Sequence, residues 1–185
     1  YIMFRFFAKL ILIKILKWKV VGSFPQIPKF VIAVFPHTSN YDFFVGIFIR
    51  SVLREEINYV GKKELFNPLT GWFFKSLGGA PLSRKGNQNV VESIVNLYNK
   101  KKTFRLAIAP EGTRKRVEEW KTGFYYIAKG AKVPILLVGF DYSKRTIHFY
   151  PLFTPTDDIK KDYKTMKSYF VGIKGKNPEN GILNL

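Results

Sequence analysis

The 185-residue chain has 31 lysine and arginine residues against 13 acidic residues, so its formal net charge is +18 at pH 7. It has no cysteine, which excludes disulfide bonds, thiol catalysis and cysteine-containing metal sites. With 46% hydrophobic and 17% aromatic residues, it is too apolar for a disordered basic tail, and its length fits one folded domain.

The first predicted element is an amphipathic helix over residues 3–21. Apolar side chains recur at helical spacing at Phe4, Phe7, Ile11, Ile15 and Trp18. Residues 1–30 contribute +6 to the net charge with no acidic residue, and the helix has no uncharged run long enough to span a bilayer. We therefore expect residues 1–25 to form a helix on an anionic membrane surface, with packing against the domain as the alternative.

Beyond Pro28, apolar runs that suit strands alternate with stretches of helical periodicity. The expected strands are 30–35, 57–60, 80–82, 104–109, 133–140 and 146–150. The expected helices are 42–53, pieces within 62–77, 90–98 and 123–129. We therefore expect residues 26–185 to form one α/β domain, with a mostly parallel or mixed central sheet flanked by helices.

His37 and Asp42 follow the first of these strands, in an HxxxxD arrangement. They can meet if His37 stays in the turn and Asp42 lies in the first helical turn, where the helix dipole favours an ionised carboxylate. A carboxylate on one imidazole nitrogen fixes the tautomer that leaves the other nitrogen basic. The pattern therefore suits a general base with an orienting group, although a capping Asp beside a turn His is the alternative.

Two basic turns follow later strands. Residues 109–116 place three cations around Glu111, Gly112, Thr113 and Arg114, and residues 78–85 include Gly79 and Arg84. Turns at strand ends are common ligand sites in α/β folds, and arginine binds phosphate with two hydrogen bonds. Solvated surface turns are the alternative.

Together these segments resemble the glycerolipid acyltransferase family, which includes 1-acylglycerol-3-phosphate acyltransferases. The family's blocks occur in order as His37–Asp42, Gly79–Arg84, Glu111–Arg114 and Val133–Ile135. The resemblance covers about residues 30–140. It departs from the family pattern at Pro36, Ala109, Lys115 and Leu137, which bears on the acceptor more than on the reaction.

The resemblance implies acyl transfer from a thioester to a lysophospholipid hydroxyl. His37 would be the base and Asp42 its orienting partner. The implied acceptor-binding residues are Arg84, Glu111, Gly112, Thr113 and Arg114, with Gly79 and Pro134 in support. No metal or redox cofactor is implied, because the substrates alone supply the acyl group.

The expected partners are an anionic membrane surface, a lysophospholipid such as 1-acylglycerol-3-phosphate, and acyl-CoA or an acyl carrier protein as donor. The expected location is peripheral, on the cytoplasmic face of a membrane.

A different lysolipid or an aminolipid remains an alternative acceptor. A nucleic-acid-binding domain is a distant alternative, because the aromatic residues cluster with aliphatic ones, and a catalytically silent relative is disfavoured because His37, Asp42, Glu111 and Arg114 are all present.

Overall fold

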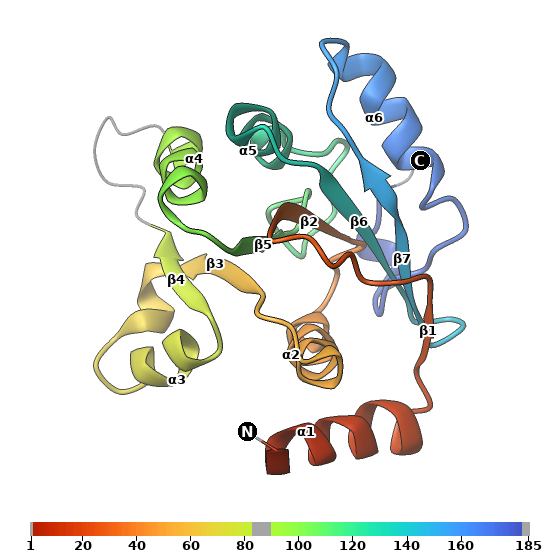
Figure 1. Ribbon diagram of the computed structural model, residues 1–185. Helices are drawn as coiled ribbons and strands as arrows, with labels where there is room; N and C mark the ends of the chain where they lie inside the picture. Colours follow the sequence, from red (N-terminus) through yellow and green to blue (C-terminus); the bar gives the residue numbers. More distant parts are fainter. Residues whose placement is uncertain (1, 83–89, 183–185) are drawn as a thin grey trace.

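A single mixed sheet forms the centre of the protein (Figure 1). The computed structural model describes residues 2–82 and 90–182, and within them seven strands pair in the order β1-β7-β6-β2-β5-β3-β4. Neighbouring strands are parallel except for β6 and β7, which form an antiparallel hairpin. The predicted fold class is therefore confirmed for the sheet and its flanking helices.

The elements lie close to the predicted ranges. The strands are β1 (Lys19–Val21), β2 (Lys29–Phe35), β3 (Asn58–Lys62), β4 (Gly79–Leu82), β5 (Phe104–Ile108), β6 (Ile135–Asp141) and β7 (Thr146–Phe153). The helices are α1 (Ile2–Lys9), η1 (Leu10–Ile15), α2 (Tyr41–Leu53), η2 (Lys63–Phe66), α3 (Gly71–Ser76), α4 (Val90–Lys100), α5 (Gly123–Ala131), α6 (Ile159–Ser168) and η3 (Pro178–Asn180). The strand β1 and the helices α6 and η3 were not predicted.

Helices cover both faces of the sheet. The side chains of the central strands are therefore buried on both sides, and almost all of them are apolar. Alternate residues of β2 face opposite ways, so Val31 and Ala33 join the core under α4, α5 and α6, while Phe30 and Ile32 join the core under α2. Figure 1 shows these two helical layers on either side of the sheet. Strands covered on both faces have continuous apolar runs, which is why β2 and β6 were predictable.

The N-terminal segment differs from the prediction of one helix over residues 3–21. Helix α1 continues as the π-helical turn η1 and ends at Ile15, and Lys17 then takes a left-handed backbone conformation with φ of 56°. The chain reverses there and adds β1 to the sheet edge beside β7. Trp18, expected on the helix stripe, is buried instead, because its ring packs edge-on against Phe140 and Tyr142.

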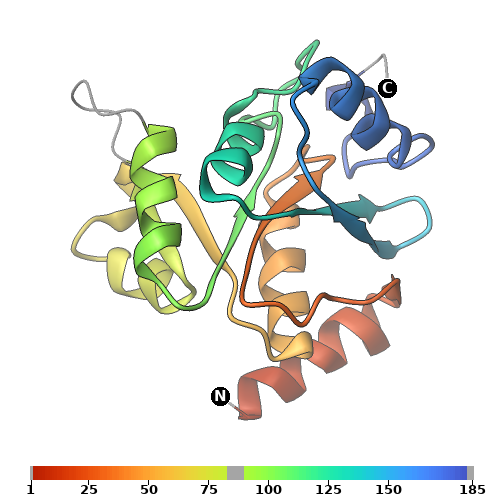
Figure 2. The same cartoon turned by 45° about the horizontal axis from the view of Figure 1, so that its top comes forward.

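Helix α1 lies across α2 on the side away from the sheet (Figure 2). It buries Ala8 and leaves Met3, Phe6 and Phe7 exposed, and Leu12 of η1 is buried with the core under α2. The side directed at the domain also includes Phe4, whose ring meets that of Phe48 on α2 with centroids 6.4 Å apart. Among the described residues, no helix is both long and apolar enough to cross a membrane.

Three central strands bring the functional segments to the edge of the sheet that is formed by the carboxyl ends of these strands. Strand β2 lies between β5 and β6, and all three are parallel. Their carboxyl ends therefore meet, and the segments that follow Phe35, Ile108 and Asp141 lie next to each other. This edge is where open α/β sheets place their ligands.

Candidate active site

His37 and Asp42 form a hydrogen-bonded pair at this edge. The His37 Nδ1 atom lies 3.1 Å from Asp42 Oδ2, with His37 in the turn after β2 and Asp42 in the first turn of α2. The Asp42 side chain is 1% exposed and that of His37 is 24% exposed. Because Nδ1 donates to the carboxylate, the neutral imidazole carries its lone pair on Nε2, which makes that atom the basic one.

The turn before α2 holds the Asp42 carboxylate in place. Its Oδ2 atom accepts hydrogen bonds from the backbone N–H groups of Thr38 and Ser39, both at 2.9 Å. Its Oδ1 atom accepts a hydrogen bond from the Tyr142 hydroxyl at 2.7 Å. These donors supply hydrogen bonds to both oxygens of a carboxylate that is otherwise buried.

Glu111 joins the turn after β5 to the histidine. Its Oε1 atom accepts a hydrogen bond from the His37 backbone N–H at 2.7 Å, and the residue is 2% exposed. Burial raises the pKa of the Glu111 carboxyl from 4.5 to about 7, against the opposing hydrogen bonds from backbone N–H groups. Its Oε2 atom is buried without a hydrogen-bond partner among the described residues.

The remainder of this turn is open to solvent. Gly112 has a φ of +63°, which favours glycine, and the Lys121 side chain lies over it so closely that a Cβ atom would stand 2.9 Å from Lys121 Cδ. Thr113 is half-buried and Arg114 is exposed. Lys121 therefore adds a cation to the turn, beside the predicted Arg114.

The comparisons with known proteins identify the family of the chain. The family model described as Acyltransferase matches residues 20–141, about two thirds of the chain. The chain belongs to the acyltransferase family. That range contains every predicted site residue, from His37 to Pro134.

The fold of this acyltransferase is also that of a solved relative. The crystal structure of the 1-acyl-sn-glycerophosphate (LPA) acyltransferase PlsC from Thermotoga maritima is similar, with a TM-score of 0.63 and 19% sequence identity. The match covers 90% of this chain and 75% of that one. No curated protein gives a significant sequence match.

Not all of the predicted site residues of the acyltransferase lie at this edge. Gly79 begins β4, at the opposite end of the strand, and a Cβ atom there would come 2.7 Å from both Phe74 O and Tyr59 Oη. Pro134 precedes β6, also at the opposite edge, and its carbonyl accepts a hydrogen bond from Val31 N. Both positions support strand packing. Arg84 lies outside the described residues.

Sequence reasoning missed three residues of this region. Tyr142 follows the end of β6, so the argument from strand ends that selected the turn after β5 could also have selected it. Asn177 donates from its backbone N–H to Thr38 Oγ1 and from its side chain to the Thr38 carbonyl, and no motif marks it. Lys121 lies several residues after the predicted turn in the sequence. Its backbone N–H donates to Pro110 O, and this hydrogen bond brings it back to the turn.

No group of three or more His, Asp or Glu side chains in residues 2–82 and 90–182 is arranged to hold a metal ion. The groups that this edge brings together are an oriented imidazole and a basic turn. Such a pair abstracts a proton from a hydroxyl group that is held within reach of Nε2.

Proposed function

We propose that the protein transfers a fatty acyl group from a thioester to a hydroxyl group of a lysophospholipid, with 1-acylglycerol-3-phosphate as the first candidate acceptor. The observation that carries the proposal is the His37–Asp42 pair, held by Glu111 to a basic turn at the same sheet edge. Membership of the acyltransferase family supports the reaction class. The likeness to PlsC supports the fold.

In this reaction His37 Nε2 takes the proton of the acceptor hydroxyl as its oxygen attacks the thioester carbonyl carbon. Protonation at Nε2 makes the ring an imidazolium, which Asp42 stabilises through its contact with Nδ1. The carbon–sulfur bond then breaks, and His37 returns the proton to the departing thiolate. A base of this kind contributes about 10²–10⁴-fold to the rate.

The acceptor phosphate binds at the turn after β5. Arg114 is exposed there, and Lys121 lies over Gly112, so two cations border the same backbone. Arginine presents paired N–H donors that match phosphate oxygens. Arg84 is assigned to the same phosphate on the family resemblance alone.

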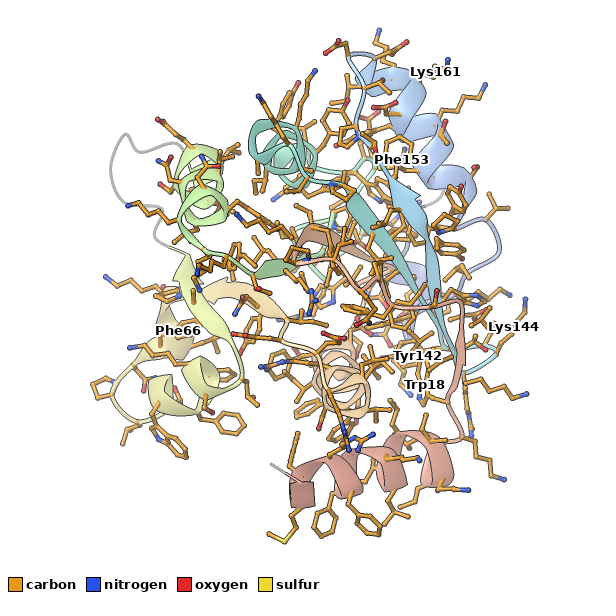
Figure 3. All side chains as sticks on the ribbon, viewed as in Figure 1. Trp18, Phe66, Tyr142, Lys144, Phe153 and Lys161 are labelled. Carbon is orange, nitrogen blue, oxygen red and sulfur yellow. The ribbon has the colours of Figure 1, made fainter. Side chains whose placement is uncertain are left out.

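The enzyme acts at an anionic lipid surface. On α1 and around α3, large apolar side chains face solvent, with Met3 74% exposed, Phe6 67%, Leu69 85% and Trp72 69%. Both helices lie on the lower side of the view in Figure 1, and in Figure 3 some of the side chains of each extend away from the sheet.

Exposed lysines accompany these apolar side chains on the same segments. They are Lys9, Lys14, Lys63 and Lys75. Apolar side chains that enter the acyl region beside lysines that reach lipid phosphates are the pattern of a membrane-surface element.

The reaction is tested by release of free thiol from acyl-CoA and from acyl carrier protein. Because the chain contains no cysteine, a thiol reagent gives no background signal from the enzyme. We expect thiol release that depends on a lysophospholipid acceptor and is lost in His37→Ala. The other histidine gives a matched variant, His148→Gln, which should retain activity. Release without any acceptor, or turnover by His37→Ala, would overturn the proposal.

The lipid surface is tested by binding to vesicles that contain phosphatidylglycerol. We expect Trp72→Ser to weaken binding about tenfold, because it removes a large apolar side chain from the bilayer interface. The matched control is Val171→Ser, since Val171 is 67% exposed in the segment after α6. Equal affinities for wild type and Trp72→Ser would exclude α3 from the membrane contact.

A further inference from the structure

The Tyr142 side chain links the hairpin between β6 and β7 to the Asp42 carboxylate. The residue is half-buried, and its hydroxyl donates to Asp42 Oδ1 at 2.7 Å. The other carboxylate oxygen, Oδ2, receives His37 Nδ1 and the backbone donors of Thr38 and Ser39. Tyr142 is thus the partner that the described residues provide for Oδ1.

The two oxygens of Asp42 have different tasks. Oδ2 orients the imidazole, whereas the contact at Oδ1 decides the rotation of the carboxylate plane and shares its negative charge. A hydroxyl group can serve this purpose only while it keeps its proton. Burial and the nearby Asp42 carboxylate both raise the pKa of the Tyr142 hydroxyl, so it stays a donor through the neutral range.

Tyr142 is itself fixed on two further sides. Its backbone N–H donates to Lys174 O at 2.8 Å. Its ring meets that of Trp18 edge-on, with centroids 4.9 Å apart and an interplanar angle of 86°. Figure 3 shows these two labelled side chains next to each other, close to α2. Because its backbone and its ring are both held, the Tyr142 side chain loses little conformational entropy when its hydroxyl donates to the carboxylate.

We propose that Tyr142 is a positioning residue that acts through Asp42, as the third member of the chain Tyr142–Asp42–His37. It holds the carboxylate in the plane from which Oδ2 meets His37 Nδ1, and it does not touch the substrate. This assignment rests on the proposed function for its effect on turnover, but the hydrogen-bond chain exists without substrate.

The test compares Tyr142→Phe with Tyr125→Phe. Both variants keep the aromatic ring and remove a hydroxyl that donates to a buried carboxylate, Asp42 at 2.7 Å in the first case and Asp162 at 2.8 Å in the second. Asp162 lies on α6, in the helical layer on the other face of the sheet. The ring of Tyr142 remains to pack on Trp18, so the fold is retained.

The first measurement is the proton resonance of His37 Nδ1–H in protein labelled with ¹⁵N at histidine. The chain has two histidines, so His148→Gln assigns the signals. Tyr142→Phe should move the resonance upfield, because a carboxylate that Tyr142 no longer holds in plane bonds the Nδ1 proton less strongly. Tyr125→Phe should leave it in place. An unmoved resonance in Tyr142→Phe would overturn the proposal, whether or not the protein acylates lysophospholipids.

The second measurement is steady-state turnover with the acceptor identified by the thiol assay. Tyr142→Phe should lower kcat about tenfold and leave KM for the acceptor unchanged, since a hydrogen bond to a charged group is lost away from the substrate. Tyr125→Phe should change neither constant. A rise in KM alone, or equal losses of kcat in the two variants, would show that Tyr142 does not act through Asp42.

Discussion

The Glu111 carboxylate accepts a hydrogen bond from the backbone N–H of His37 at 2.7 Å, across 74 positions of the chain. The basic turn after β5 and the histidine turn after β2 are therefore held as one unit. Because Glu111 is buried, its contribution to the site is through this contact and through the turn that it begins. The residue that the family resemblance assigns to acceptor binding thus also contacts the backbone of His37, the proposed base.

Glu111→Gln should change how stability depends on pH. The pKa of Glu111 is raised to about 7 in the folded protein from 4.5, so the folded state binds the proton more tightly. The stability associated with this group is present below pH 4.5 and is lost as the pH rises through 7, by on the order of 3 kcal/mol. Glutamine cannot ionise, so the variant should gain stability relative to wild type between pH 5 and 8.

Urea unfolding of both proteins at pH 5 and at pH 8 measures this difference in the free energy of unfolding. The control is Glu118→Gln, at an exposed carboxylate in the same loop, which should give the wild-type dependence. If Glu111→Gln and wild type lose stability in parallel over this range, the pKa of Glu111 is not raised by folding.

Asp42→Asn should lower kcat about 10²–10⁴-fold with little change in acceptor KM. The amide oxygen can take the Oδ2 position, where it still meets the Thr38 and Ser39 donors, so the turn keeps its geometry. What is lost is the negative charge that stabilises the imidazolium form of His37.

Steady-state kinetics measure the effect of Asp42→Asn. The control is Asp162→Asn, at a buried carboxylate bound by Tyr125 and Thr156 on the far layer, which should keep the wild-type kcat. A loss confined to acceptor affinity would contradict the orienting role of Asp42.

Arg114→Ala should raise the KM for a phosphorylated acceptor by about tenfold or more, because a hydrogen-bonded charge pair with phosphate is removed. The kcat at saturating acceptor should change less. Lys102→Ala removes an exposed cation just before β5, at the opposite edge of the sheet, and should have no effect on KM. An unchanged KM in Arg114→Ala would exclude the phosphate contact.

Gly112→Ala should destabilise the protein by about 1 kcal/mol, since alanine at a φ of +63° is strained, and should displace Lys121. Gly172→Ala imposes the same strain at a φ of +81°, where a Cβ atom meets nothing within 4 Å. The two variants should therefore unfold alike in urea, while Gly112→Ala alone raises acceptor KM. Equal KM values in both would mean that the Lys121 position does not matter to binding.

Residues with a local signature were predictable. The apolar runs of β2 and β6 identified strands buried on both faces, and the His37–Asp42 spacing identified a turn followed by a helix start. Helix α6 was missed because its ten residues include four lysines and few apolar side chains. Its buried Met166 and partly buried Tyr163 make contacts that depend on the core already formed. Arg84 was predicted from a motif and lies outside the described residues.

The N-terminal segment shows where local patterning fails. Its helical periodicity is real as far as Ile15, but the pattern cannot reveal that β7 offers a free edge to pair with Lys19–Val21. Nor can it reveal that the Trp18 ring packs against Phe140 and Tyr142. Helical periodicity is a weak preference that such tertiary pairing and burial override.

Length, composition and charge thus determined that this is one folded, strongly basic, cysteine-free domain, and its motifs pointed to an acyltransferase. Which charged and polar groups meet was decided by the tertiary structure, because parallel order brings the ends of β2, β5 and β6 to one edge. That edge joins His37 to Glu111 and Asp42 to Tyr142, a residue 100 positions away. Contacts across such distances depend on the order of the strands, and no local pattern carries that order.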